Sequence, residues 1–195
     1  MDAHAEPLPF VAAALRPRRP AGALSARAER AAVRGAQRGE EAALEVLFRA
    51  HWPVAYRAAW LIVRDVHAAE DIAQEGFVAA VQALDRFDRT RPFGPWLRTI
   101  VARRAIDAAR TRALRREVDA AALLDHVGAA VSEIPGDELM GAVAALPDEQ
   151  RVPLVLRHLL ELTPAEIAKL LGIPRGTVNS RVRRGLDALA LEVQR

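Results

Sequence analysis

The sequence contains no cysteine among its 195 residues. This absence excludes disulfide bonds, thiolate metal sites and a thiol redox sensor within the chain. Aromatic residues make up only 5% of the sequence, whereas hydrophobic residues make up 51%, and alanine supplies much of that fraction. Because alanine is the strongest helix former, we expect helical cores that contain few aromatic side chains.

Long apolar runs are missing as well. No segment approaches the roughly 18 consecutive apolar residues that a membrane-spanning helix requires. The N-terminal stretch LPFVAAAL is short and is followed by RPRRP, a pattern that does not fit a secretory signal peptide. We therefore expect a cytoplasmic protein without membrane insertion.

Common signatures of catalysis and metal binding are also absent. The sequence has no GxGxxG, Walker, GxSxG or HExxH motif. Its five histidines show no metal-ligand spacing, which favours surface or helix-packing roles for them. They are His4, His51, His67, His126 and His158. We expect no metal, no cofactor and no catalytic residue, and hence a protein that is not an enzyme.

Charge is distributed unevenly, although the net charge is only +3. Residues 86–116 contain ten arginines and two aspartates, whereas residues 117–149 contain eight acidic residues and neither lysine nor arginine. Such blocks are typical of a polyanion-binding surface beside an acidic connector, but they equally fit solvated helix faces. Charge alone does not decide between these interpretations.

Glycine, proline and composition divide the chain into parts. We predict an all-α fold with two small helical domains, at 26–116 and 138–195, joined by a flexible acidic linker at 117–137 and preceded by a disordered basic arm at 1–25. Pro153 should kink its helix or delay the first full turn. The predicted helices cover residues 26–36, 40–63, 66–84, 94–114, 137–145, 148–160, 164–171 and 175–192.

The clearest local motif is TPAEIAKLLGIPRGTVNSRVRR, residues 163–184. Thr163, Pro164 and Glu166 have the spacing of a capping box with proline at the first helical position. Gly172 can take the left-handed conformation that ends a helix, and the next proline can open another one. This pattern predicts a helix-turn-helix, although a helical hairpin with a basic outer face would share part of it.

The second helix of this motif separates apolar from polar side chains. Val178, Val182 and Leu186 form an apolar stripe at intervals of four residues. Arg175 and Thr177, at the start of the helix, suit contacts with base edges in the major groove, and the later arginines suit phosphates. The candidate DNA-binding residues are Arg175, Thr177, Asn179, Ser180, Arg181, Arg183 and Arg184.

The stretch ALPDEQRVPLVLRHLLELTPAEIAKLLGIPRGTVNSRVRRGLDAL resembles region 4 of sigma-70-family transcription factors. The resemblance implies that this domain binds the −35 promoter element. Asn179 stands where the family often has lysine, a departure that bears on phosphate contact or base preference. Helix-turn-helix domains of this type also occur in other bacterial regulators, so this resemblance alone does not prove a sigma factor.

The first domain carries two further stretches, AEDIAQEGFVAAVQALDRF at 69–87 and RPFGPWLRTIVARRAIDAARTRALRR at 91–116. The first reads as an acidic amphipathic helix, and the second as an aromatic Pro/Gly loop followed by an arginine-rich helix. Aromatic rings beside arginines suit unpaired bases, although Phe93 and Trp96 can also pack in a core, which for Trp96 is the favoured interpretation.

Together these stretches resemble region 2 of sigma factors, specifically of the two-domain extracytoplasmic-function group. The resemblance implies a docking helix for the β′ clamp of core RNA polymerase, with Asp71, Gln74, Glu75 and Phe77 as contacts. It also implies a loop and a helix that capture, read and melt the −10 element. The −10 candidates are Phe87, Phe93, Trp96, Arg98, Arg103, Arg104, Asp107 and Arg110.

Three partners follow from the resemblance: core RNA polymerase through its β′ clamp and β flap, promoter DNA, and an anti-sigma factor. Arg103 stands where many relatives have asparagine, which bears on the −10 preference. The Asp107–Arg110 pair matches the family, but its spacing also fits a simple intrahelical ion pair. A linker of about 21 residues reaches up to about 70 Å, or two turns of DNA.

The main alternative is a self-sufficient DNA-binding regulator whose first domain senses a signal or dimerises. Such a regulator would bind duplex DNA tightly without polymerase. The AEDIAQEGF and WLRTI blocks argue against it, because a dimerisation domain has no need of them.

Overall fold

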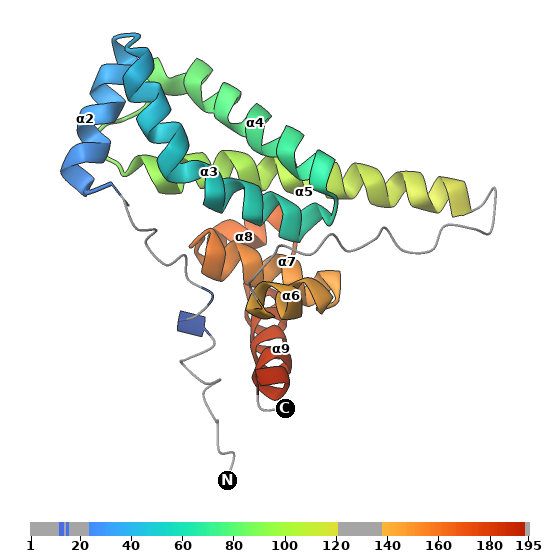
Figure 1. The fold of residues 1–195 in the computed structure, drawn as a ribbon. Helices are drawn as coiled ribbons and strands as arrows, with labels where there is room; N and C mark the ends of the chain where they lie inside the picture. Colours follow the sequence, from blue (N-terminus) through green and yellow to red (C-terminus); the bar gives the residue numbers. More distant parts are fainter. Residues whose placement is uncertain (1–11, 14, 16–23, 121–137, 194–195) are drawn as a thin grey trace. The chain divides into compact units, whose positions relative to one another are not determined.

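The computed structural model describes residues 12, 13, 15, 24–120 and 138–193, and these fall into two compact units (Figure 1). One unit is built around residues 24–120 and the other around residues 138–193. All regular structure within these residues is helical, without a strand. The prediction of an all-α fold with two helical domains is therefore confirmed.

Four long helices form the first unit, and they match the predicted ones closely. They are α2 (Ala26–Gln37), α3 (Glu41–Val63), α4 (Val66–Ala83) and α5 (Phe93–Ala120), with a short 3₁₀ turn at Leu84–Arg86. Side-chain caps set two of the helix starts: Ser25 Oγ accepts from Ala28 N at 3.1 Å, and Asp65 Oδ1 accepts from Ala68 N at 2.9 Å.

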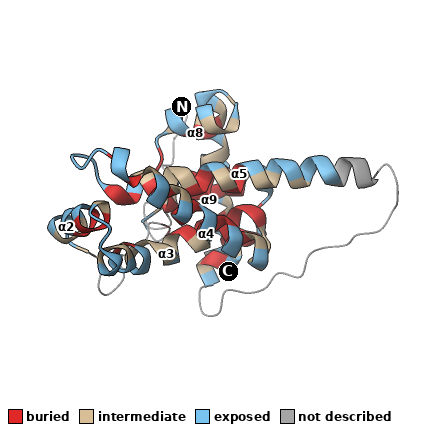
Figure 2. Cartoon of the chain, turned by 90° about the horizontal axis from the view of Figure 1, so that it is seen from above, coloured by how far each residue is buried: buried red, intermediate tan, exposed pale blue. Residues whose placement is uncertain are grey.

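Helix α3 packs against the other three helices of this unit. The buried face of α5 carries Leu97, Val101 and Ala105 at intervals of four residues, so one stripe of the helix faces the core (Figure 2). Helices α4 and α5 approach closely at Gly76, where an added Cβ would lie only 2.7 Å from Val101 Cγ2. The glycine thus sets how tightly the two helices pack.

The second unit contains α6 (Glu138–Ala145), α7 (Asp148–Leu154), α8 (Pro164–Leu171) and α9 (Arg175–Val193). The helix predicted at 148–160 has two parts, because a π-helical turn at Val155–Leu159 follows α7. Pro153 lies inside α7, which begins at Asp148 as predicted, and the π-type hydrogen bond from Leu160 N to Val155 O follows it. The kink or delayed first turn expected from this proline stays a prediction.

The segments outside the two helical domains differ in part from expectation. Helix α5 continues to Ala120, so residues 117–120 of the predicted linker are helical. The sequence of this segment has neither glycine nor proline to end the helix. Residues 121–137 lie outside the described residues. Of the predicted arm, only residues 12, 13, 15, 24 and 25 are described; the first three are helical and Leu15 is buried.

Candidate nucleic-acid interface

The turn between α8 and α9 is held by caps that lie within a few residues of it. Glu166 N donates to Thr163 Oγ1 at 3.3 Å, and Thr163 N donates to Glu166 Oε2 at 2.7 Å, which completes the predicted capping box. The hydroxyl and backbone N–H of Thr163 donate to the Glu166 carboxylate and lower its pKa. Gly172 adopts φ 70° and ends α8.

Helix α9 buries one face and exposes the other. Val178 and Leu186 of the predicted stripe are buried, together with Leu189. Gly185 permits close packing on α7, because an added Cβ would lie 2.9 Å from Leu154 Cδ1. Of the seven candidate −35 residues, Thr177 and Arg181 are half-buried, and the exposed ones are Arg175, Asn179, Ser180, Arg183 and Arg184.

Two of the α9 arginines have acidic neighbours within their own unit. Arg181 lies 3.6 Å from Glu149 on α7, and Arg183 lies 4.0 Å from Asp187 one turn later. Arg175 stands at the first position of α9, directly after the turn. The arrangement presents an exposed helix start with a basic flank, as major-groove binding requires.

The candidate −10 residues on α5 separate into exposed and partly buried side chains. Arg103, Asp107 and Arg110 are exposed and follow one another at spacings of four and three residues, so they share one helix face. Arg98 and Arg104 are half-buried. Arg110 Nη1 lies 3.8 Å from Asp107 Oδ1, as the i, i+3 spacing allows.

The three candidate −10 aromatics form a cluster instead of an open stacking platform. Phe87 is 7% and Phe93 4% exposed, and their rings meet edge to face at 5.8 Å between centroids. Trp96 is half-buried and lies 4.5 Å from Phe87 and 5.6 Å from Phe93. In this conformation the two phenylalanines are buried, and Trp96 is the most accessible ring of the three.

The loop ahead of α5, residues 88–92, is exposed throughout. Asp88 organises its start, because Oδ1 accepts hydrogen bonds from Thr90 N at 2.9 Å and from Thr90 Oγ1 at 2.7 Å. These two donors lower the pKa of Asp88. Arg89 and Arg91 are exposed on the same loop, which therefore combines a defined turn with two cations.

The candidate docking residues lie on α4. Asp71, Gln74 and Glu75 are exposed, whereas Phe77 is buried. Glu75 Oε2 accepts a hydrogen bond from Arg104 Nη1 of α5 at 2.7 Å. A candidate polymerase contact and a candidate promoter contact are therefore joined in one ion pair, a pairing that the sequence did not indicate.

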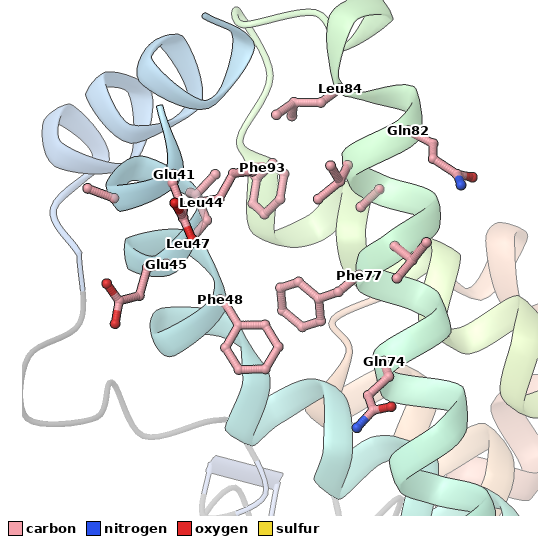
Figure 3. Close-up of a pocket in the computed structure, with 14 residues that line it drawn as sticks. Glu41, Leu44, Glu45, Leu47, Phe48, Gln74, Phe77, Gln82, Leu84 and Phe93 are labelled. Carbon is pink, nitrogen blue, oxygen red and sulfur yellow. The ribbon is translucent and has the colours of Figure 1, made fainter. Parts of the chain in front are cut away.

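An apolar groove of about 1030 Å³ lies between α3 and α4, and the predicted docking residues Gln74 and Phe77 line it (Figure 3). The rings of Phe48 and Phe77 lie next to each other at its wall, in tilted contact with centroids 4.9 Å apart. Val78 and Val81, on the apolar side of the predicted amphipathic helix, are 55% and 47% exposed. Asp71, Gln74, Val78 and Val81 follow one another at intervals of three, four and three residues. This spacing could have placed all four on one exposed stripe of the helix.

A polar contact made by Arg112 of α5 also escaped the sequence analysis. Arg112 Nη2 pairs with Asp65 Oδ2 at 2.6 Å, and its Nη1 donates to Val63 O at 3.0 Å. Asp65 is also the N-cap of α4, and the Ala68 N–H followed by Arg112 lowers its pKa. Arg112 of α5 therefore binds the connection between α3 and α4 through both an ion pair and a hydrogen bond.

Among the residues that the structure describes, no group of three or more histidines and acids could hold a metal ion. No helix in the same part of the chain is long and apolar enough to cross a bilayer.

Comparison with protein families assigns both units. The family described as Sigma-70 region 2 matches residues 47–115, and the family described as Sigma-70, region 4 matches residues 136–189. The chain is 33% identical to the extracytoplasmic-function (ECF) RNA polymerase sigma factor SigW of Bacillus subtilis, over 71% of this chain and 82% of the relative. It is 32% identical to the ECF sigma factor SigC of Mycobacterium tuberculosis, over 82% and 88%.

Solved structures share the fold. CnrH, in its complex with the cytosolic domain of CnrY, is 26% identical with a TM-score of 0.56, covering 86% of this chain and 97% of that one. The sigma factor RpoE of Bartonella quintana, in complex with the anti-sigma factor NepR, also has a TM-score of 0.56 and covers 77% and 98%. At 22% identity, the second likeness concerns the fold alone.

A helix-turn-helix unit and a four-helix unit that match sigma regions 4 and 2 define a bacterial transcription initiation factor. The chain belongs to the sigma-70 family, and within it to the ECF RNA polymerase sigma factors. It is an alternative sigma factor that binds core RNA polymerase and directs it to promoter DNA, and it is not an enzyme.

Proposed function

We propose that α9 enters the major groove of a −35 element. Arg175 and Thr177 read base edges, while Arg183 and Arg184 bind phosphates and Asn179 and Ser180 complete the polar face. The support is α9 itself, whose exposed basic face lies opposite a buried stripe and directly follows a capped turn. Arg181 makes a weaker contact with DNA phosphates, because its guanidinium also pairs with Glu149 at 3.6 Å.

For the −10 element, we propose that loop 88–92 and α5 divide the work. The exposed loop receives an unpaired base against Trp96, while Phe87 and Phe93 support that surface from the core. On α5, Arg103, Asp107 and Arg110 face the −10 DNA, and Arg98 and Arg104 contribute at its edge. Strand opening costs base stacking, which capture of the unpaired base offsets.

Docking on polymerase is proposed to use the exposed stripe of α4 and the groove beside it. Asp71, Gln74 and Glu75 supply polar contacts to the β′ clamp, and Phe77 supplies the apolar floor of the groove. Exposed valines on the same stripe add apolar area, which is typical of the centre of a protein interface. The second unit is proposed to contact the β flap.

The chain is proposed to work in the cytoplasm, where polymerase and promoters are found, with its domains at 26–116 and 138–195. CnrH was solved in complex with the cytosolic domain of CnrY, and the sigma factor RpoE, which shares the fold, in complex with the anti-sigma factor NepR. We infer a partner of the same kind for this chain, which would cover the α4 stripe and thereby exclude polymerase.

The assigned roles are tested by separating promoter choice from polymerase binding. Arg175→Ala should reduce discrimination between matched and scrambled −35 DNA by about 1–3 kcal/mol, because a bidentate base contact is lost. The same variant should still co-elute with core polymerase, whereas Asp71→Ala combined with Glu75→Ala should not.

Equal −35 discrimination by wild type and Arg175→Ala would remove the proposed reading role of Arg175. Tight duplex binding by the chain alone, without co-elution with polymerase, would favour a stand-alone regulator.

A further inference from the structure

The start of α5 lacks a cap of its own. Pro92 precedes the helix and offers no side-chain oxygen to the first turn. The first turn of a helix leaves its N–H groups without intrahelical partners, but Pro92 and Pro95 have no N–H at all. Only Phe93 and Gly94 therefore have N–H groups that need partners from outside the helix.

Glu29 of α2 caps this end. Phe93 N donates to Glu29 Oε2 at 3.3 Å, and the neighbouring Gly94 N–H helps to lower the pKa of the same carboxylate. His51 of α3 lies beside it, with Nε2 3.0 Å from Glu29 Oε1. The imidazole and the two backbone donors lower the pKa of Glu29 against the opposing effect of burial. A carboxylate at this end also complements the helix dipole.

Gly94 leaves the space that this arrangement needs. A Cβ added there would lie 2.9 Å from His51 Cε1 and 3.3 Å from His51 Nδ1. Any larger residue would push the imidazole away from the Glu29 carboxylate. The glycine of the RPFGP stretch thus has a packing role that its loop-like composition did not indicate.

The other end of loop 88–92 is held by the same helix. Gln37 Nε2 donates to Leu84 O at 2.8 Å and to Phe87 O at 3.3 Å, just before the loop begins. Glu29 and Gln37 are eight residues apart on α2, about 12 Å along the helix axis. One helix therefore holds the chain on both sides of the loop.

We propose that α2 positions the −10 loop. Its Glu29 side chain caps the N-terminus of α5, and its Gln37 side chain binds the backbone at the other end of the loop. This rests on the proposed role of loop 88–92 in capturing a −10 base. Helix α2 lies before residue 47, where the match to sigma-70 region 2 begins, so the family comparison assigns it no part.

The physical reason is pre-organisation. A loop whose ends are fixed loses less conformational entropy when it receives an unpaired base, so capture is more favourable. The Asp88 turn defines the middle of the loop, the buried rings of Phe87 and Phe93 pack at its two ends, and the α2 hydrogen bonds tie the backbone of both ends to the helical core. Loosening either end should weaken capture of the base without touching the α4 stripe.

The experiment uses the full chain bound to core RNA polymerase. The wild-type holoenzyme first selects promoters from a library randomised at the −10 positions. Each variant holoenzyme is then bound to two pre-opened templates, one with the selected −10 sequence and one with a scrambled sequence, and the readout is the ratio of the two binding constants. This ratio does not depend on the fraction of active protein. Permanganate reactivity of thymines on the closed duplex measures opening in parallel.

Glu29→Ala should lower the ratio and the opening roughly fivefold or more, the size expected when a helix loses its N-cap. Glu29→Gln should retain most of both, because the amide oxygen still accepts from backbone N–H groups. Gln37→Ala should lower the ratio less, since the residues that it anchors remain packed. Arg30→Ala, a change at an exposed neighbour on α2, is the matched control and should resemble wild type.

The proposal is overturned if Glu29→Ala and Gln37→Ala discriminate as well as Arg30→Ala, or if Glu29→Gln is as impaired as Glu29→Ala. A parallel loss of polymerase co-elution would also overturn it, because general unfolding would then explain the effect. If the wild-type holoenzyme selects no −10 sequence, the proposed role of the loop fails instead.

Discussion

The two sites that we propose to face DNA are held in place by contacts of very different range. At the α8–α9 turn, the capping hydrogen bonds join residues three positions apart in the sequence. At the start of α5, the cap comes from a residue 64 positions away, and the other end of the loop is held across 47 and 50 positions. The −35 site is therefore locally encoded, whereas the −10 loop depends on the packing of the whole first unit.

This difference fits the tasks of the two sites. Binding an intact duplex needs a preformed helix face, which local caps and one buried stripe can supply. Receiving a base from a melting duplex needs a loop held at a defined place relative to a long helix. Contacts from a separate element, such as α2, can hold a loop in that way.

The largest effect is expected from a core change in the second unit. Ile167 is fully buried in α8, so Ile167→Ala should destabilise this unit by about 2–5 kcal/mol through lost burial and a cavity. If the two sites are independent, −35 binding should fall while polymerase co-elution and discrimination in a pre-opened −10 template persist. Thermal unfolding followed by circular dichroism would measure the loss, and a matching loss of −10 discrimination would contradict independence.

A smaller effect tests the local cap. Thr163→Ala should cost about 1 kcal/mol of stability in the second unit, and −10 discrimination should not change. Because the folded-state pKa of Glu166 is lowered, the contribution of its capping box is present above the ordinary pKa and is lost as pH falls through the folded value.

Urea unfolding of wild type and Thr163→Ala at several pH values between about 6 and 3 would measure this contribution. The difference between the two proteins should shrink toward acid. A difference that grows as the pH falls would contradict this account of the cap.

The smallest effect concerns an arrangement that both sites share. In each, an arginine of the helix proposed to bind DNA pairs with a glutamate of a neighbouring helix. Arg104 lies 2.7 Å from Glu75, and Arg181 lies 3.6 Å from Glu149. Both glutamates are at least half exposed, so double-mutant cycles to alanine should give coupling energies of at most about 1 kcal/mol.

The closer pair, in the first unit, should show the larger coupling, and added salt should weaken both pairs. Chemical unfolding at low and high ionic strength measures these energies. Equal couplings that salt does not change would show that Coulomb attraction is not what joins these helices.

The helices, the capping box, the left-handed Gly172 and the polar face of α9 could all be predicted from the sequence. Each follows from helix periodicity or from hydrogen bonds within a few residues, and these are visible in any short window. The likeness to sigma regions 2 and 4 has the same origin, since those motifs are contiguous stretches.

The tertiary structure alone decided which side chains are available. It buried Phe87 and Phe93, left Val78 and Val81 exposed and paired Arg104 with Glu75. Periodicity identifies a helix face but not the partner that covers it, and a cap supplied from 64 positions away leaves no local pattern. For this protein, sequence determined where the helices and the basic face of α9 lie, and packing between distant helices decided how loop 88–92 is held.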